Sequence, residues 1–165
     1  MRINKNYLKK SSKSEMKIDK IDFDDIRDIR FSIVNEFWNG FKNDKNILSF
    51  WFAPKEPLDK DRYFNIHYSQ APYYQFGTMY YPAGTTKPKF YKFILETKSF
   101  PNSYRSDSLF IRFTKQDLGK TFYLIKGKLE ISDKPTLYTP CISDLESNKQ
   151  ALIPPEGDYK EIQPM

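Results

Sequence analysis

Apolar residues change their spacing within the first third of this 165-residue chain. Between residues 22 and 41 they recur at steps of three, four and seven, which is the spacing of one face of an amphipathic helix. From residue 47 to residue 131 they alternate with polar residues, as in strands that are buried on one side. The sequence therefore predicts one helix followed by a series of strands.

The predicted helix covers residues 22–41 and is expected to face the core with its apolar side. Asp22 is the expected N-cap, and Asp24 and Asp25 would lie in the first turn, where the helix dipole favours negative charge. Gly40 stands near the expected end of the helix. The apolar stripe consists of Ile26, Ile29, Ile33, Val34, Phe37, Trp38 and Phe41.

The alternating segments are separated by stretches rich in Pro, Gly, Asn and Asp, which favour turns. Strands joined in this way pair mostly as antiparallel neighbours, so we expect an antiparallel sheet or a partly open barrel. The spacing of Ser143 and Glu146 predicts a capping box and a short second helix. The fold class predicted from these elements is α+β. The predicted strands cover residues 47–52, 62–69, 78–81, 89–97, 109–115 and 121–131, and the second helix covers residues 144–152.

The ends of the chain lack this periodicity. Residues 1–20 are expected to form a flexible basic arm, and residues 154–165 an extended C-terminal tail. Residues 21–153 would form a single α+β domain, since a chain of this length fits one hydrophobic core. Because 17% of the residues are Phe, Tyr or Trp, we expect that core to be rich in aromatic rings.

Charge is distributed unevenly along the chain, whose formal net charge is +6. Residues 85–128 hold 10 basic and 3 acidic residues, whereas residues 129–165 hold 3 basic and 7 acidic residues. The basic segment would suit nucleic acid or another acidic partner. The alternative is that the acidic C-terminal segment folds back and neutralises it.

A nucleic-acid-binding face follows if the strands at 89–97, 109–115 and 121–131 are neighbours. Alternation would then place phenylalanine rings and cations on one side, where bases stack on rings while lysines contact phosphates. Coverage of that face by the helix or by the tail is the alternative interpretation. The candidate nucleic-acid-binding residues are Phe90, Lys92, Lys98, Phe110, Arg112, Phe122, Lys126 and Lys128.

An aromatic segment interrupted by proline and glycine follows the strand at 62–69. Tyrosines on such a loop can bury their rings and still offer hydroxyl groups to a partner, as in protein interfaces. We expect this loop to dock another protein, the alternative being that it lines the edge of its own sheet. The candidate interface residues are Tyr73, Tyr74, Phe76, Tyr80 and Tyr81.

A weak nuclease pattern is also present. Glu96 and Lys98 end an apolar strand, and Asp59 and Asp61 precede them. This arrangement resembles the acid and Glu-x-Lys signature of restriction-endonuclease-like nucleases, which implies carboxylates that hold Mg²⁺ and a lysine that positions water. The same acid-x-Lys spacing recurs by chance at residues 15–17 and 158–160. Because so short a pattern arises by chance, no catalytic residue is assigned.

Cysteine and histidine each occur once, as Cys141 and His67, and alternation places His67 on the same strand face as Tyr63, Asn65 and Ser69. A single cysteine excludes an internal disulfide, and the pair offers too few ligands for a structural zinc site, so no metal or cofactor is expected. We expect an intracellular, reducing compartment and no membrane insertion, because no apolar run is long enough to span a bilayer. The basic, serine-rich residues 1–14 leave an organelle matrix as an alternative.

These features favour a non-catalytic protein over an enzyme. The preferred hypothesis is an accessory or structural binding subunit of a larger assembly, which docks on a protein partner through the aromatic loop and the extended termini. The alternatives are a single-stranded nucleic-acid-binding module and a small Mg²⁺-dependent nuclease.

Overall fold

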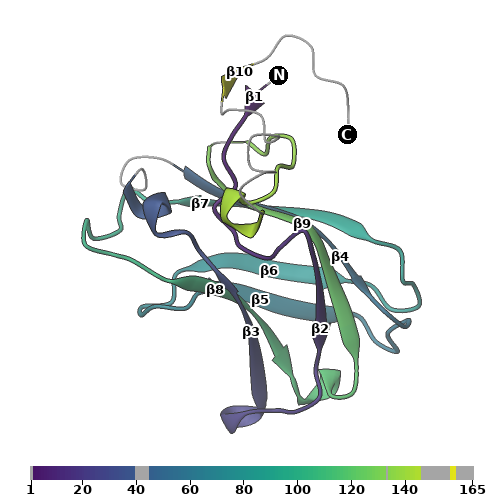
Figure 1. Ribbon diagram of the computed structural model, residues 1–165. Helices are drawn as coiled ribbons and strands as arrows, with labels where there is room; N and C mark the ends of the chain where they lie inside the picture. The colour runs from purple at the N-terminus through teal and green to yellow at the C-terminus, as the bar shows by residue number, and fades with distance from the viewer. Residues whose placement is uncertain (1, 40–44, 133, 146–156, 159–165) are drawn as a thin grey trace.

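Two four-stranded antiparallel sheets pack face to face as a β-sandwich (Figure 1). The computed structural model describes residues 2–39, 45–132, 134–145 and 157–158. We name the sheets by a central strand. The β4 sheet has the order β2 (Lys13–Lys17), β9 (Thr121–Ile131), β4 (Lys45–Pro54), β7 (Lys89–Glu96), and the β5 sheet has the order β3 (Ile26–Ser32), β8 (Ser108–Thr114), β5 (Arg62–Tyr68), β6 (Gln75–Tyr81).

The remaining elements are short. Strand β1 (Arg2–Ile3) pairs with β10 (Gly157–Asp158) beside the sandwich (Figure 1). The helical turns in the described part of the chain are all of the 3₁₀ type, and none of them is long and apolar enough to cross a membrane. These turns are η1 (Phe23–Asp25), η2 (Asn35–Asn39), η4 (Lys115–Asp117) and η5 (Ile142–Asp144).

The predicted α+β class is wrong, because residues 26–32 form a strand in place of an amphipathic helix. Strand β3 pairs with β8 along its whole length, from Ile26 opposite Thr114 to Ser32 opposite Ser108. Ile29, Phe31 and Ile33 are spaced by two and point inward, so the segment carries a strand pattern within its helical one. Tertiary pairing therefore overrides the helical periodicity.

The remaining predictions concern the strands, the N-terminal arm and the second helix. Every predicted strand overlaps an observed strand, and the antiparallel pairing is confirmed. Within the expected flexible arm, residues 13–17 form β2, and Leu8 and Ile18 are buried in the core. At the predicted second helix, the described chain has only the η5 turn, and residues 146–152 lie outside the described ranges.

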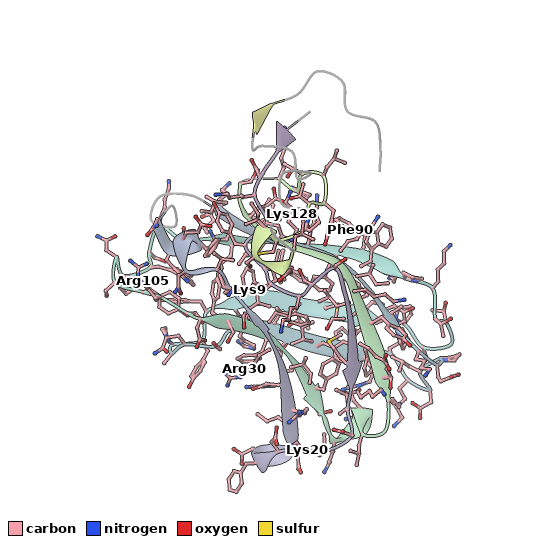
Figure 2. The ribbon with its side chains drawn as sticks, in the orientation of Figure 1. Lys9, Lys20, Arg30, Phe90, Arg105 and Lys128 are labelled. Carbon is pink, nitrogen blue, oxygen red and sulfur yellow. The ribbon has the colours of Figure 1, made fainter. Side chains whose placement is uncertain are left out.

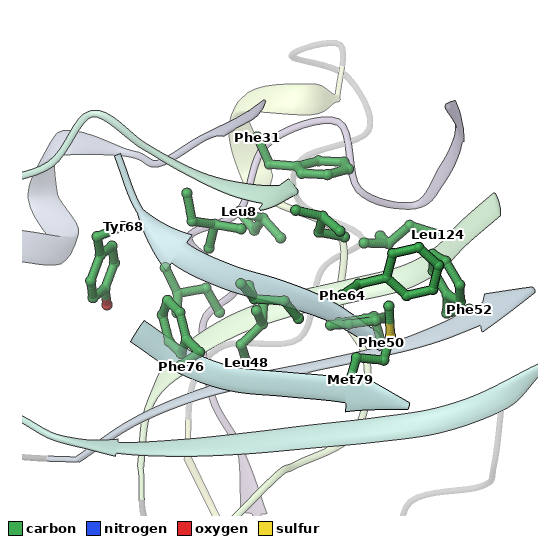
Figure 3. Packing of buried hydrophobic residues seen from close by; sticks show 14 of the residues in the cluster. Leu8, Phe31, Leu48, Phe50, Phe52, Phe64, Tyr68, Phe76, Met79 and Leu124 are labelled. Atoms are coloured by element: carbon green, nitrogen blue, oxygen red, sulfur yellow. The ribbon is translucent and has the colours of Figure 1, made fainter. Parts of the chain in front are cut away.

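Aromatic rings fill the space between the sheets (Figure 3). The ring of Phe52 in the β4 sheet stacks on Phe122, with centroids 5.5 Å apart. It also contacts Phe64 of the β5 sheet, with centroids 5.4 Å apart. Phe113 lies 5.3 Å from Phe64 and 5.0 Å from Phe122, measured between ring centroids. The edge strands β6 and β7 approach closely, since a Cβ added at Gly77 would lie 2.7 Å from Phe93.

Residues after β9 cross one end of the outer surface of the β4 sheet and bury polar groups beneath them. Glu130 is fully buried and accepts hydrogen bonds from the Asn4 side chain and from both the amide and the hydroxyl of Thr136. Lys128 is also fully buried and donates to the Thr136 hydroxyl at 2.9 Å and to the Leu137 carbonyl at 2.6 Å. This end of the sheet is therefore closed to a ligand.

Candidate functional site

The outer surface of the β5 sheet carries aligned rows of polar and aromatic side chains, which we call the β5 face. Its rows follow from strand register, because residues opposite one another on an antiparallel sheet share a side. Neighbouring rows are about 7 Å apart along the strands. The first row is Arg30, Phe110, His67 and Gln75, the second is Asp28, Arg112, Asn65 and Thr78, and the third includes Tyr63 and Tyr80.

The middle row is held rigid by hydrogen bonds between its own members. Arg112 Nε donates to Asp28 Oδ1 at 2.9 Å, and its Nη2 donates to Oδ2 at 3.1 Å. The hydrogen bond that Arg112 donates to Asp28 raises the pKa of the guanidinium, and the carboxylate charge acts in the same direction. Next to this pair, the Thr78 hydroxyl donates to Asn65 Oδ1 at 2.9 Å. The row therefore presents fixed donors and acceptors to the outside.

His67 and Phe110 form a stacked pair beside that row. Their ring centroids are 5.3 Å apart at an interplanar angle of 23°, and the Arg112 guanidinium lies 5.1 Å from the Phe110 centroid. Phe110 is only 2% exposed, so its ring is the base of the face and not a contact surface. His67 Nδ1 donates to the Tyr73 carbonyl oxygen at 3.1 Å, since a carbonyl can only accept. Its Nε2 atom is buried without a hydrogen-bond partner among the residues described.

Tyr73 presents an exposed ring at the same end of the face. Its backbone adopts a left-handed conformation with φ of 64°, which is unfavourable for a tyrosine. The side chain is 54% exposed. A strained backbone thus holds an accessible ring at the end of the face where His67 contacts the Tyr73 carbonyl.

Tyr63 and Tyr80 form a second aromatic group at the far end of the face. Their centroids are 5.2 Å apart, and the side chains are 63% and 37% exposed. The Tyr80 hydroxyl donates to Asp61 at 3.0 Å, and this hydrogen bond raises the pKa of the phenol. The Lys89 ammonium lies 5.6 Å from the Tyr80 centroid. The β5 face therefore has exposed rings at both ends and a fixed polar row between them.

The candidate nucleic-acid-binding residues do not lie on one surface, because β8 belongs to one sheet and β7 and β9 to the other. Phe110 and Arg112 are on the β5 face, and Phe90 and Lys92 are on the outer surface of the β4 sheet. Lys98 and Lys126 are exposed outside these groups, in the turn after β7 and in β9. The nucleic-acid hypothesis thus loses its shared face and remains untested as a function.

Two of the candidate nucleic-acid-binding residues are buried. Phe122 has no exposed surface and packs in the core, and Lys128 lies beneath the segment after β9. The alternation predicted for residues 121–131 fails because the register of β4 and β9 shifts between Ser49 and Trp51. Lys126, next to that irregularity, has a φ of 53°. A β-bulge exchanges the inward and outward residues, and alternation read from the sequence does not locate it.

The candidate interface residues are divided between the core and the surface. Phe76 and Tyr81 are buried, and Tyr74 stacks on Phe100 with centroids 3.6 Å apart. Tyr73 and Tyr80 remain exposed, and both belong to the β5 face. Docking of a protein through this segment stays a prediction.

The nuclease candidates are not brought together. Glu96 is the last residue of β7 and pairs with Lys45, the first residue of the neighbouring strand β4, at 3.7 Å. Asp59 pairs with Lys120 at 3.2 Å, and Asp61 binds the Ala83 amide and Tyr80 near the opposite end of β7. Across the described ranges, no group of three or more His, Cys, Asp or Glu side chains could hold a metal ion. Lys98, which follows β7, therefore has no carboxylate cluster to work with in this part of the chain.

Sequence reasoning found part of the β5 face. Alternation in residues 62–69 places Tyr63, Asn65 and His67 on one side of a strand, as observed. Asp28 and Arg30 were missed because their segment was assigned to a helix. The signal that could have found them is the alternation of Asp28, Arg30 and Ser32 with Ile29 and Phe31.

Comparison with known proteins supports the fold. No protein-family model and no curated protein matches the chain. The tripod (BppUct-A-L) from the baseplate of bacteriophage Tuc2009 aligns over 87% of this chain and 61% of that chain, at 13% identity and a TM-score of 0.53. The arabinose-bound α-L-arabinofuranosidase MgGH51 aligns over 70% of this chain and 18% of that chain, at 15% identity and a TM-score of 0.52.

A family 29 carbohydrate-binding module from Piromyces equi aligns over 83% of this chain and 93% of that chain, at 10% identity and a TM-score of 0.44. At such identities a similarity concerns the fold alone. The chain spans less than two thirds of the length of both the phage and the arabinofuranosidase chains. The comparisons therefore agree with the description of this chain as a β-sandwich.

Proposed function

We propose that this protein is a non-catalytic carbohydrate-binding protein whose β5 face contacts a short oligosaccharide. The observation that carries the proposal is the exposed Tyr63 and Tyr80 pair beside the hydrogen-bonded row of Asp28, Arg112 and Asn65. A sugar ring has an apolar face of C–H groups that packs on aromatic rings, and a rim of hydroxyls that needs donors and acceptors. The β5 face offers both on one surface.

The polar row is suited to hydroxyl groups because its geometry is already set. Asp28 occupies two of the five guanidinium N–H donors of Arg112, and no other described residue accepts a hydrogen bond from the remaining three, which would serve a ligand. Side chains that are already ordered lose little conformational entropy when a ligand binds. Hydroxyls would thus be recognised at a small ordering cost.

The length of the face favours an oligosaccharide over a single sugar. His67 lies in the first row and Tyr63 in the third, so the two aromatic ends are separated by two row spacings, about 13 Å. This is longer than one pyranose ring. We expect one sugar to stack on the Tyr63 and Tyr80 pair and another to lie near Tyr73.

The first test measures binding of the purified chain to a panel of soluble polysaccharides by affinity electrophoresis. For each polysaccharide that retards the chain, calorimetry with the matching oligosaccharides then gives the affinity. We expect retardation by at least one, and a loss of affinity of about tenfold or more in Tyr63→Ala. Tyr80→Ala should change affinity in the same direction. Phe23→Ala is the matched control, because Phe23 is an exposed ring in η1, outside the β5 face.

Two outcomes would contradict the proposal. One is the absence of binding to every glycan in a broad panel, and the other is equal binding by the wild type and Tyr63→Ala. A single-stranded oligonucleotide belongs in the same panel. Its binding in the absence of any glycan binding would support the nucleic-acid module instead.

A structural subunit of a larger assembly is the second candidate. The observation that favours it is the edge strand β7, which pairs with no described strand besides β4 and whose Phe90 and Ile94 side chains are each 46% exposed. The test is isolation of the native protein from its source followed by mass spectrometry of what co-purifies. A stoichiometric protein partner would support this candidate, and a native monomer would contradict it.

A further inference from the structure

Strand β7 carries apolar side chains on both sides, and those of neither side are fully covered. It is the one strand of the two sheets in which no residue is buried. Phe90 and Ile94 point outward, and Phe90 extends away from the sandwich in Figure 2. The inward residues Tyr91 and Phe93 are also only partly buried, whereas Phe50 and Phe52 of neighbouring β4 have no exposed surface. Apolar area of this kind is stabilised when another surface covers it.

The backbone of β7 is also open. The strand stands at the end of the β4 sheet and pairs only with β4 within the described chain. No backbone hydrogen bond outside this ladder joins Lys89–Glu96 to another described segment. Exposed edges are usually blunted by proline, by a bulge, by a very short strand or by charged side chains, lysine above all. β7 has 8 residues without proline, glycine or a register shift, so charge is the device that remains, and a strand that places a carboxylate opposite Lys92 can still pair with it.

We propose that β7 pairs in antiparallel fashion with β7 of a second copy of this chain, about a two-fold axis at Ile94. Such pairing joins the two β4 sheets into one continuous sheet and uses the same residues from both copies, as an isologous dimer requires. The register places Ile94 opposite Ile94 of the second copy. It keeps the outward sides of both strands on the same surface, because the axis is perpendicular to the sheet.

Charge and shape favour this register. Lys92 lies two residues before the axis and Glu96 two residues after it, so each Lys92 faces Glu96 of the other copy. Opposite charges that face each other across neighbouring strands are favourable. On the inward side Phe93 faces Leu95 of the other copy, and both are partly buried apolar residues. Centring the pair on Lys92 would instead place two like charges together.

Charged neighbours within the same chain leave Lys92 and Glu96 free to contact the second copy. Glu96 is 72% exposed and its contact with Lys45 is long, at 3.7 Å, so its carboxylate can accept a second cation. Lys92 is exposed and forms no ion pair with the described residues. A second copy of the chain is therefore preferred to an unrelated partner, because β7 supplies both members of each charge pair.

The test is sedimentation velocity of the full chain at low salt, from about 1 to 200 μM, which resolves weak association by mass action. We expect a concentration-dependent dimer. Lys92→Glu should raise its dissociation constant about tenfold or more, since two attractive contacts become repulsive. The Lys92→Glu, Glu96→Lys double variant should restore association. Lys13→Glu is the matched control, because Lys13 lies on β2 at the opposite edge of the same sheet.

A monomer at every concentration would overturn the proposal. So would a dimer whose dissociation constant is unchanged in Lys92→Glu, or one that the double variant fails to restore. Hydrogen exchange gives an independent readout, because dimerisation should slow exchange of the β7 amides. Slower exchange confined to another strand would assign the interface to that strand and reject β7.

Discussion

Arg112 and Asp28 form a two-bond ion pair between β8 and β3, in the middle of the outer surface of the β5 sheet. The pair joins the edge strand to a central strand and fixes the guanidinium plane beside Asn65. Its side chains are 33% and 19% exposed, so the contact is partly shielded from water. The pair thus contributes both to the sheet and to the proposed ligand surface.

Replacing Asp28 with Asn should lower the free energy of unfolding by about 1 kcal/mol, because a partly buried bidentate contact is stronger than an exposed ion pair. Urea denaturation measures this change. Asp22→Asn is the control, since Asp22 contacts Arg27 through one hydrogen bond and is 49% exposed. Its effect should be less than about 0.5 kcal/mol. Equal effects of both substitutions would contradict the role assigned to Asp28.

Asp117 should be far more important for stability than for binding. It has no exposed surface and accepts two hydrogen bonds from Arg62 and one from the Thr114 amide. Asp117→Ala would leave the guanidinium of the 11% exposed Arg62 side chain with its hydrogen bond to Thr114 but without its carboxylate, so we expect a loss of about 3 kcal/mol or more.

Thermal and urea denaturation would measure the effect at Asp117. Asp25→Asn is the control, because Asp25 and its partner Lys115 are both 70% exposed and asparagine tolerates the φ of 60° at this position. That substitution should change stability by no more than about 0.5 kcal/mol. A mild effect at Asp117 would show that the buried pair is dispensable.

Tyr73 should behave in the opposite way, since its backbone conformation costs stability while its ring serves the proposed surface. Asparagine tolerates the left-handed region better than tyrosine, so Tyr73→Asn should leave the free energy of unfolding unchanged or raise it by up to about 1 kcal/mol. Glycan affinity should fall in the same variant. Denaturation and calorimetry on one preparation give both values, and a stable variant with unchanged affinity would remove Tyr73 from the site.

Cys141 should react slowly in the folded protein. It is 1% exposed, and burial raises the pKa of its thiol, so less of the reactive thiolate is present at a given pH. We expect an aromatic disulfide reagent at mildly alkaline pH to label the native chain at least about tenfold more slowly than the urea-unfolded chain. Similar rates in both states would place the thiol at the surface.

The sequence alone was enough to locate strands where alternation was the only periodicity present. Residues 89–96 and 108–114 are examples, because their inward residues Tyr91, Phe93, Leu109 and Ile111 follow directly from a period of two. Alternation also placed Tyr63, Asn65 and His67 together. Local spacing is sufficient there, since successive side chains of a strand point to opposite sides.

The tertiary structure decided what local spacing leaves open. Residues 26–32 fit both a helix and a strand, and pairing with β8, far along the chain, selected the strand. The irregular register of β9 turned Phe122 into the core, and the segment after β9 covered Lys128 on the outer side of the sheet. The division of β7, β8 and β9 between two sheets separated side chains that alternation alone had grouped. Strand order depends on long-range contacts, and these form only when the whole chain buries its rings in one core.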